Sequence, residues 1–252
     1  MCDTCGCGDP ELVSVDLHES ILAGNATQAA HNREHFAASG ILAVNLMGSP
    51  GSGKTALLEA TARAMPGHRL AALSGDLATD HDGERLRAAG IPAATITTGS
   101  ACHLDAKLVH HALHHLDLGG ADTLVVENVG NLVCPAIYDL GEAANVVALS
   151  VTEGEDKPLK YPVMFRKADL VLLTKVDLLP HLPGFRLDAL EDALARTMPQ
   201  VRMIRLSAVS GEGLPEWIAW LEARRAALPP PTGRAHRHDA SHGTAHEHSS
   251  HD

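Results

Sequence analysis

Short apolar runs alternate with segments of helical periodicity from residue 40 to about residue 228. The runs are rich in Val, Leu and Ile and mostly lack polar alternation, as in strands buried on both faces. They lie at 41–47, 69–74, 93–97, 122–127, 145–151, 169–174 and 201–206. Helical patterns separate many of them, at 54–65, 82–89, 103–116, 186–197 and 214–227. This alternation predicts an α/β fold with a doubly wound, mainly parallel sheet, whose ligands bind at the carboxyl ends of the strands.

The two ends of the chain differ from this middle region. Residues 1–10 are rich in Cys and Gly, and residues 11–39 carry a scattered helical period that predicts one or two lead-in helices. After Leu228 three consecutive prolines end any helix, and the segment 229–252 is polar and rich in histidine. We therefore expect a terminal Cys-rich segment, a helical lead-in, a main domain over 40–228 and a disordered tail.

Charge and composition narrow the range of partners. The 252 residues include 31 acidic and 20 basic side chains, for a net charge of −11, and only 3% are aromatic. Such a surface disfavours nucleic acid as the main partner, because backbone phosphates need cations and bases need aromatic platforms. No apolar run is long enough for a membrane span, and the N-terminus lacks an apolar leader. We expect a cytoplasmic protein whose five cysteines bind metal rather than form disulfides.

A phosphate-binding loop lies between the first expected strand and the helix that follows it. The stretch 48–55 reads GSPGSGKT and satisfies G-x-x-x-x-G-K-[ST] in the context that this motif requires. Its expected nucleotide-binding residues are Gly48, Ser49, Gly51, Ser52, Gly53, Lys54 and Thr55. Backbone N–H groups and the helix N-terminus would face the phosphates. Lys54 would reach the β- and γ-phosphates, and the Thr55 hydroxyl would ligate Mg²⁺.

Acidic side chains follow two of the expected strands. Asp76 comes just after 69–74, and Glu127 ends 122–127. Either carboxylate could hold Mg²⁺, directly or through water, and either could orient the attacking water. Asp80 is a weaker third candidate, and the sequence leaves the assignment open.

Two further elements indicate guanine recognition. Thr174, Lys175 and Asp177 fit the spacing of N-K-x-D, in which the Asp accepts hydrogen bonds from guanine N1–H and N2–H₂. Adenine lacks that pair of donors, so a buried carboxylate would discriminate against it. The first position of the motif is Thr174 and not Asn, so the sequence does not show whether the polar contact made by Asn is kept. Thirty residues later Ser207 and Ala208 resemble the S-A element that contacts guanine O6, in the order found in G proteins.

Cysteine and histidine are grouped in metal-binding patterns. Cys2, Cys5 and Cys7 place three thiols within six residues, a set that suits Ni²⁺ when nitrogen donors join it in a square plane. Cys102, His103 and Cys134 follow strand ends on the expected nucleotide face and form an incomplete ligand shell. Water or a second subunit could complete that shell. Movement of the segment 127–134 on hydrolysis would then change metal affinity.

Other histidines leave two interpretations open. His110, His111, His114 and His115 are spaced so that the pairs 110/114 and 111/115 could each chelate a metal, or simply form an exposed polar face. The tail carries six further histidines, which would bind metal weakly and could buffer it; they are His236, His238, His242, His246, His248 and His251.

The combination of motifs resembles the HypB family of nickel-inserting GTPases in [NiFe]-hydrogenase maturation. The similar stretches are 1–8, 48–55, 99–105, 127–135 and 153–162. The resemblance implies the P-loop fold of the dimerising (SIMIBI) metallochaperone NTPases, with slow hydrolysis of GTP to GDP. It also implies a GTP- or metal-promoted homodimer, with Cys102, His103 and Cys134 as an internal Ni²⁺ or Zn²⁺ site at the interface. Cys2, Cys5 and Cys7 would form the tighter Ni²⁺ site, and the partners would be a HypA-type chaperone and the hydrogenase large subunit precursor.

Three other functions remain open at this stage. A related chaperone GTPase could serve urease or a cobalamin enzyme, although the Cys-Pro-His motif usual in the urease type is absent. A P-loop kinase for small molecules would need a different base site. A nickel storage protein would not need the intact Lys54 and Thr55.

Overall fold

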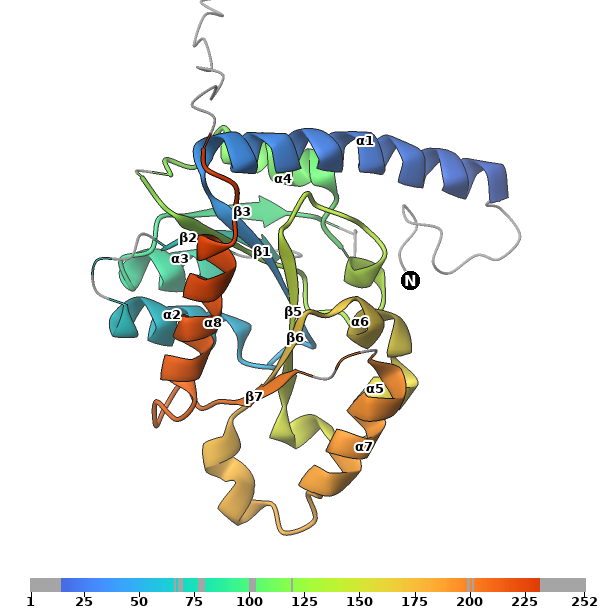
Figure 1. Ribbon diagram of the computed structural model, residues 1–252, viewed down its shortest axis with the longest axis vertical. Coiled ribbons are helices and arrows are strands. Elements are labelled where there is room, and N and C mark those ends of the chain that lie inside the picture. The colour runs from blue at the N-terminus through green and yellow to red at the C-terminus, as the bar shows by residue number, and fades with distance from the viewer. Residues whose placement is uncertain are drawn as a thin grey trace, which may run out of the picture.

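The computed structural model describes residues 15–65, 67, 70–76, 80–99, 103–118, 120–198, 200 and 202–231, with side chains from residue 21 onward. In this part of the chain seven strands form one sheet in the order β3-β2-β4-β1-β5-β6-β7, and all neighbours are parallel. Helices cover both faces of the sheet (Figure 1). The predicted doubly wound α/β fold is confirmed.

The strands coincide with the apolar runs of the sequence to within about two residues at each end. They are β1 (Leu42–Met47), β2 (Leu70–Asp76), β3 (Ala93–Thr97), β4 (Thr123–Glu127), β5 (Ala144–Ser150), β6 (Leu170–Thr174) and β7 (Met203–Arg205). The described helices are α1 (Val15–Ser39), α2 (Lys54–Ala64), α3 (His81–Ala88), α4 (Ala106–Leu113), α5 (Lys157–Lys160), α6 (Pro162–Lys167), α7 (Leu187–Thr197) and α8 (Leu214–Ala226). Three short 3₁₀ helices join them, η1 (Cys134–Ala136), η2 (Val151–Glu153) and η3 (Val176–His181).

Alternate residues of each strand enter different apolar layers. In β1, Leu42, Val44 and Leu46 pack with α2, α3 and α8, whereas Ala43 packs on the opposite face with α1 and α4. Helices α6 and α7 continue that second layer along β5 and β6. Because both faces are buried, each Val or Leu withdrawn from water contributes about 1.5–3 kcal/mol.

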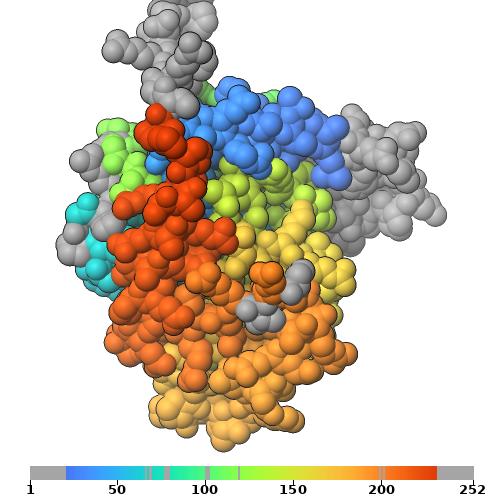
Figure 2. All heavy atoms as spheres, in the orientation of Figure 1, coloured from blue at the N-terminus to red at the C-terminus, as the bar shows by residue number. Residues whose placement is uncertain are grey.

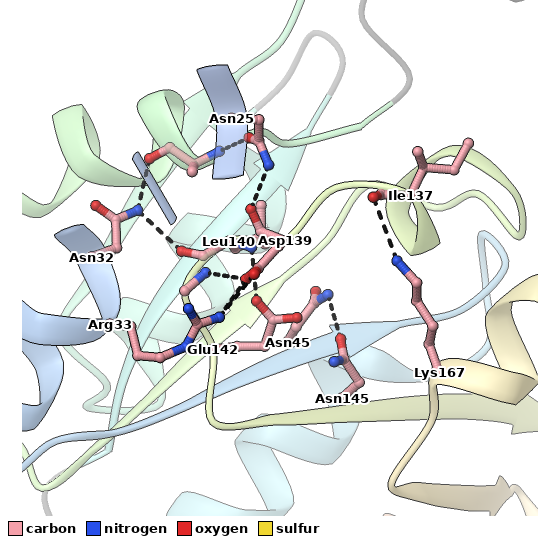
Figure 3. Close-up of polar contacts among 12 residues, drawn as sticks. Asn25, Asn32, Arg33, Asn45, Ile137, Asp139, Leu140, Glu142, Asn145 and Lys167 are labelled. Carbon is pink, nitrogen blue, oxygen red and sulfur yellow. Dashed lines mark hydrogen bonds and ion pairs between the residues drawn. The ribbon is translucent and has the colours of Figure 1, made fainter. Parts of the chain in front are cut away.

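The described part of the N-terminal lead-in is one continuous helix, α1, that lies beside α4 (Figure 1). The amide of Asn32 donates to the backbone oxygens of Ala106 (2.8 Å) and Leu140 (3.0 Å), and Asn25 accepts from the Ala106 N–H (2.9 Å). Arg33 forms an ion pair with Asp139, in which its Nη2 lies 2.8 Å from both carboxylate oxygens (Figure 3). Helix α1 is therefore held to the start of α4 and to the loop that precedes β5.

The last described helix completes the opposite layer. Trp217 of α8 is fully buried, and its indole N–H donates to the Thr61 hydroxyl of α2 at 3.0 Å, which satisfies the polar atom of a core aromatic. Beyond α8, Pro231 lies against Gly40, which follows the last residue of α1, so the end of the described chain lies beside the end of α1 (Figure 2).

One local expectation was wrong, and two short helices were missed. The helix expected over 103–116 begins only at Ala106, because Asp105 caps it by accepting a hydrogen bond from the Leu108 N–H at 2.7 Å. Helices α5 and α6 were not predicted, and each carries a proline in its first turn.

Within the described residues, no helix combines the length and apolar character needed to cross a bilayer.

Candidate functional site

The loop between β1 and α2 has the backbone shape that its glycines predict. Gly51 and Gly53 adopt φ angles of 74° and 94°, a region that side-chain-bearing residues rarely enter. Gly53 is the N-cap of α2, so the first N–H groups of that helix open toward the loop. At position 48 only glycine fits, because an added Cβ would collide with the Ala148 carbonyl oxygen and the Ser52 hydroxyl. The loop is thus shaped by its own sequence before any phosphate is bound.

Lys54 lies folded back over this loop. Its Nζ donates to the carbonyl oxygens of Gly48 (3.3 Å) and Ser49 (3.2 Å), and the side chain is buried. Burial lowers the pKa of Lys54, whereas the nearby carboxylates, foremost Glu127, oppose that shift. The ammonium group is therefore placed at the phosphate loop by weak carbonyl contacts that an anion could replace.

Two carboxylates contact Thr55 at the carboxyl end of the sheet. The Thr55 hydroxyl lies 2.8 Å from Glu127 Oε1 and 2.9 Å from Asp82 Oδ1. A cavity of about 450 Å³ is lined by these residues together with Asp76, Lys54 and the glycines of the loop. Such a volume suits a ligand of nucleotide size.

Glu127 is the most strongly perturbed acid of the cavity. Desolvation raises its pKa to about 7, and the Lys54 charge and the Thr55 hydroxyl pull in the opposite direction. Within the described part of the chain, Glu127 Oε2 is buried without a hydrogen-bond partner. A buried carboxyl oxygen that lacks a donor is costly, which is typical of a site that awaits a ligand.

The expected base-recognition residues lie together beside the cavity. Thr174 donates to the Ser52 carbonyl at 2.6 Å, and Lys175 Nζ donates to the Gly51 carbonyl at 2.6 Å. Ser207 Oγ donates to Asp177 Oδ1 at 2.5 Å, so the 207–208 turn and the Asp177 carboxylate meet. The Thr in place of Asn therefore still ties β6 to the phosphate loop.

Lys175 has a backbone that the sequence did not indicate. Its φ is +60°, and it is the one non-glycine residue in the described chain with a positive φ. Left-handed backbone costs a side-chain-bearing residue about 1 kcal/mol or more. The strain turns the chain sharply after β6 and places Lys175 on the cavity wall.

The expected internal metal ligands are only partly described. His103 is buried and stacks on Tyr138, with ring centroids 4.0 Å apart and planes inclined by 13°. Burial lowers its pKa, which favours the neutral imidazole that metals bind. Cys134 begins η1 and is partly exposed. Cys102 lies outside the described residues, as do Cys2, Cys5, Cys7 and the tail histidines. Among the described side chains no group of three or more ligands is set around one point.

Sequence reasoning missed three residues of these sites. Asp82 touches Thr55, and Arg85 lines the cavity while Glu59 holds its guanidinium with two contacts of 3.0 Å. Tyr138 covers His103. None of the three belongs to a local motif, since their positions depend on how α3 and the 138–142 loop pack. Asp80, by contrast, turns to Thr95 and Arg87 and is not among the residues that line the cavity.

The segment 127–134 connects the cavity with the region of Cys134. A β-bridge joins Gly48 of the phosphate loop to Asn131. Gly130 lies so close to Pro50 that an added Cβ would come within 2.8–3.0 Å of it. The side-chain oxygen of Asn128 accepts a hydrogen bond from the Leu104 N–H at 3.4 Å, and Leu104 directly follows His103. A shift of the phosphate loop would therefore displace both His103 and Cys134, the described members of the expected metal site.

Comparison with known proteins agrees with this arrangement. A family model described as CobW/HypB/UreG, nucleotide-binding domain, matches residues 42–205. The chain is 52% identical over 214 residues to the hydrogenase maturation factor HypB of Azotobacter chroococcum, covering 84% of this chain and 70% of the relative. It is 46% identical over 223 residues to that of Escherichia coli K12, covering 88% and 76%.

A solved structure supports the same placement. HypB from Helicobacter pylori in complex with nickel matches with a TM-score of 0.77 at 39% identity, covering 81% of this chain and 95% of that one. The P-loop fold implied by the sequence resemblance is thereby confirmed. The family model, the relatives and the shared fold show that this chain belongs to the CobW/HypB/UreG family, as one of its HypB-type members.

Proposed function

We infer that this chain is a GTPase whose hydrolysis cycle controls nickel delivery to the hydrogenase large subunit during maturation. The observation that carries this proposal is the placement of Lys54, Thr55 and Glu127 in one cavity with Lys175 on its wall. Relatives of this chain are named hydrogenase maturation factors, and one solved relative holds nickel. Nickel is the cargo of the cycle, and GTP supplies the free energy.

Guanine selection rests on Asp177. Its carboxylate is already oriented by the Ser207 hydroxyl and lies two residues beyond Lys175, whose stem would pack over the base. Adenine offers no donor pair to this carboxylate, so binding ATP would leave Asp177 without the two hydrogen bonds that guanine donates. The Ser207–Ala208 backbone would contact guanine O6.

The acidic side of the cavity fits a hard divalent cation. Thr55, Asp76, Asp82 and Glu127 offer only oxygen atoms, and one oxygen of Glu127 is buried without a partner in the described chain. Oxygen donors of this kind are those that Mg²⁺ prefers. When bound with nucleotide, Mg²⁺ would neutralise charge that develops on the phosphates. Lys54 would hold the β- and γ-phosphates, and Glu127 or Asp76 would orient the attacking water.

Nickel would bind at two places. Cys102, His103 and Cys134 form the internal site, which Zn²⁺ can also occupy, and Cys2, Cys5 and Cys7 form the terminal site. The segment 127–134 supports coupling between nucleotide and internal metal, because Gly130 and Asn131 contact the phosphate loop and Cys134 ends the segment. Loss of the γ-phosphate would shift this segment and change the internal ligand geometry.

Assembly belongs to the same proposal. Three ligands leave a metal shell incomplete, so a second copy of the chain would complete it across a GTP- or metal-promoted dimer. A HypA-type chaperone would be the exchange partner, and the large subunit precursor would be the recipient.

The proposal is tested by comparing GTP and ATP hydrolysis by the purified full chain. We expect slow release of phosphate from GTP, little from ATP, and none from Lys54→Ala, whereas Lys107→Ala on the exposed part of α4 behaves as the parent chain. Equal turnover of ATP, or transfer of phosphate to a small-molecule acceptor, would overturn it in favour of a kinase.

A further inference from the structure

Imidazole side chains from two helices meet where α1 lies beside α4. His31 comes from α1, and His110 and His114 lie one turn apart at the end of α4. The ring centroids of His31 and His110 are 5.1 Å apart, and those of His110 and His114 are 4.9 Å apart. His31 and His114 are exposed and His110 is half-buried, so the cluster is open to solvent. None of the three lines the phosphate cavity.

The distance within the α4 pair matches that of two ligands on one metal. His110 Nε2 and His114 Nε2 are 3.4 Å apart. Two Zn–N bonds of about 2.0–2.1 Å at a tetrahedral angle place their nitrogens about 3.3–3.4 Å apart. An i, i+4 histidine pair on a helix is also the spacing by which helices bind zinc. The helix backbone thus presets the separation that a chelate needs.

The third histidine is fixed in place by the docking of α1. Asn32, next to His31, donates to the Ala106 carbonyl at the start of α4, and Asn25 accepts from the Ala106 N–H (Figure 3). These bonds hold α1 along α4 and keep His31 beside His110. Partial burial and the surrounding imidazoles, first that of His114, lower the pKa of His110, which favours the neutral ring that metals bind.

We propose that His110 and His114 form a two-point binding site for a divalent transition-metal ion, with His31 of α1 as the nearest third donor. Imidazole nitrogens suit Zn²⁺, Ni²⁺ and Cu²⁺, and water fills the remaining positions. No three ligands of the described chain already surround one point, so His31 turns toward the ion when it binds. The site joins α1 to α4, uses none of Cys102, His103 and Cys134, and does not depend on GTP hydrolysis.

The same geometry also fits a metal-free hydrogen bond between two neutral imidazoles. In that case one ring donates to the other, and added metal leaves both rings as they were. The two cases differ in how His114 reacts with a histidine-modifying reagent when Zn²⁺ is added, because a coordinated nitrogen is no longer nucleophilic.

The test is modification of the reduced full chain by diethyl pyrocarbonate at increasing buffered Zn²⁺, read by peptide mass spectrometry. This readout resolves each histidine, so metal bound at cysteines or in the tail does not obscure it. We expect Zn²⁺ to protect His110 and His114 together, while His181 on η3 continues to react. If His114 reacts at an unchanged rate while Zn²⁺ binds elsewhere, the pair is only hydrogen-bonded and the proposal fails.

Variants test the chelate itself. His110→Gln is expected to raise the Zn²⁺ midpoint for protection of His114 by about tenfold or more, because the second donor acts at high effective concentration. His181→Gln, at an exposed position of η3, leaves the midpoint unchanged. His31→Gln raises it by a smaller factor, and no change there would contradict the role of His31. Protection of His114 that survives His110→Gln unaltered would overturn the proposal. None of these outcomes requires GTPase activity.

Discussion

At the scale of single residues, the site is built around one buried carboxyl group. Glu127 ends a central strand, touches Thr55, and has an oxygen without a partner in the described chain. The sequence could predict Lys54, Thr55 and Glu127, because a local motif or a strand end places each of them. It could not predict Asp82, since only the packing of α3 against α2 brings that side chain to Thr55.

Glu127→Gln is expected to stabilise the nucleotide-free protein at pH 8 and to slow GTP hydrolysis by about 100-fold or more. Because burial raises the pKa of Glu127 from 4.5 to about 7, its contribution to stability is fully present below pH 4.5 and is lost as pH rises through 7. The loss amounts to roughly 3 kcal/mol at most, and Gln avoids it. Thermal unfolding without Mg²⁺ at pH 5 and pH 8, together with phosphate release, checks both parts.

The control for this variant is Glu216→Gln on the exposed face of α8, which should change neither quantity. An equal change in melting temperature at pH 5 and pH 8 would show that the Glu127 carboxyl is ionised in the folded protein at both values. Unchanged hydrolysis would remove Glu127 from the catalytic residues.

Asp177→Asn is expected to exchange the preferred base. The amide presents a donor where the carboxylate presented an acceptor, so it suits the 2-oxo group of xanthine and repels the 2-amino group of guanine. GTP affinity should fall by roughly 100-fold or more, and that for xanthosine triphosphate should rise. Competition against a fluorescent GTP analogue measures both, with the exposed Asp188→Asn as control. Retained GTP preference would place guanine recognition elsewhere.

At the scale of elements, hydrophobic pattern was a sufficient guide to the strands but not to every helix. The runs at 122–127 and 169–174 predicted β4 and β6 nearly to the residue, because strands buried on both faces are apolar throughout. Helices α5 and α6 have four and six residues, too few for a helical period to become visible. Helix α4 began later than expected because a local cap at Asp105 overrides the apolar pattern.

Gly130→Ala tests the connection between the phosphate loop and the 127–134 segment. The new methyl group would meet Pro50 backbone atoms at 2.9–3.0 Å, so one of the two segments must move. Overpacking of this kind costs about 1–3 kcal/mol, and we expect GTPγS affinity to fall by tenfold or more. Titration calorimetry with GTPγS measures the effect.

Gly184→Ala is the matched control, because an added Cβ there meets no atom within 4 Å. It should bind nucleotide as the parent chain does. If Gly130→Ala also leaves nucleotide affinity unchanged, contact between the segment and the phosphate loop is not needed for binding, and the proposed route of coupling is wrong.

At the scale of the whole molecule, the sheet brings residues of the proposed nucleotide site to one edge. Glu127 at the end of β4 and Thr174 at the end of β6 lie on the two sides of β1, whose carboxyl end continues into the phosphate loop. The alternation of strands and helices in the sequence predicted this edge, because ligands of such sheets bind at the carboxyl ends of the strands. The sequence could not predict that Tyr138 stacks on His103 or that α1 packs beside α4, because both depend on contacts between distant segments.

We propose that nucleotide state controls metal binding at Cys102, His103 and Cys134. The most direct measurement is Ni²⁺ titration of the reduced full chain with GTPγS and with GDP, followed by light scattering for mass. A variant lacking the thiols at 2, 5 and 7 isolates the internal site, and one lacking those at 102 and 134 removes it. We predict that internal Ni²⁺ affinity differs between the two nucleotides and that dimer mass follows it. Equal affinity in both states, with the thiols at 102 and 134 dispensable, would exclude this coupling and indicate separate storage and GTPase activities.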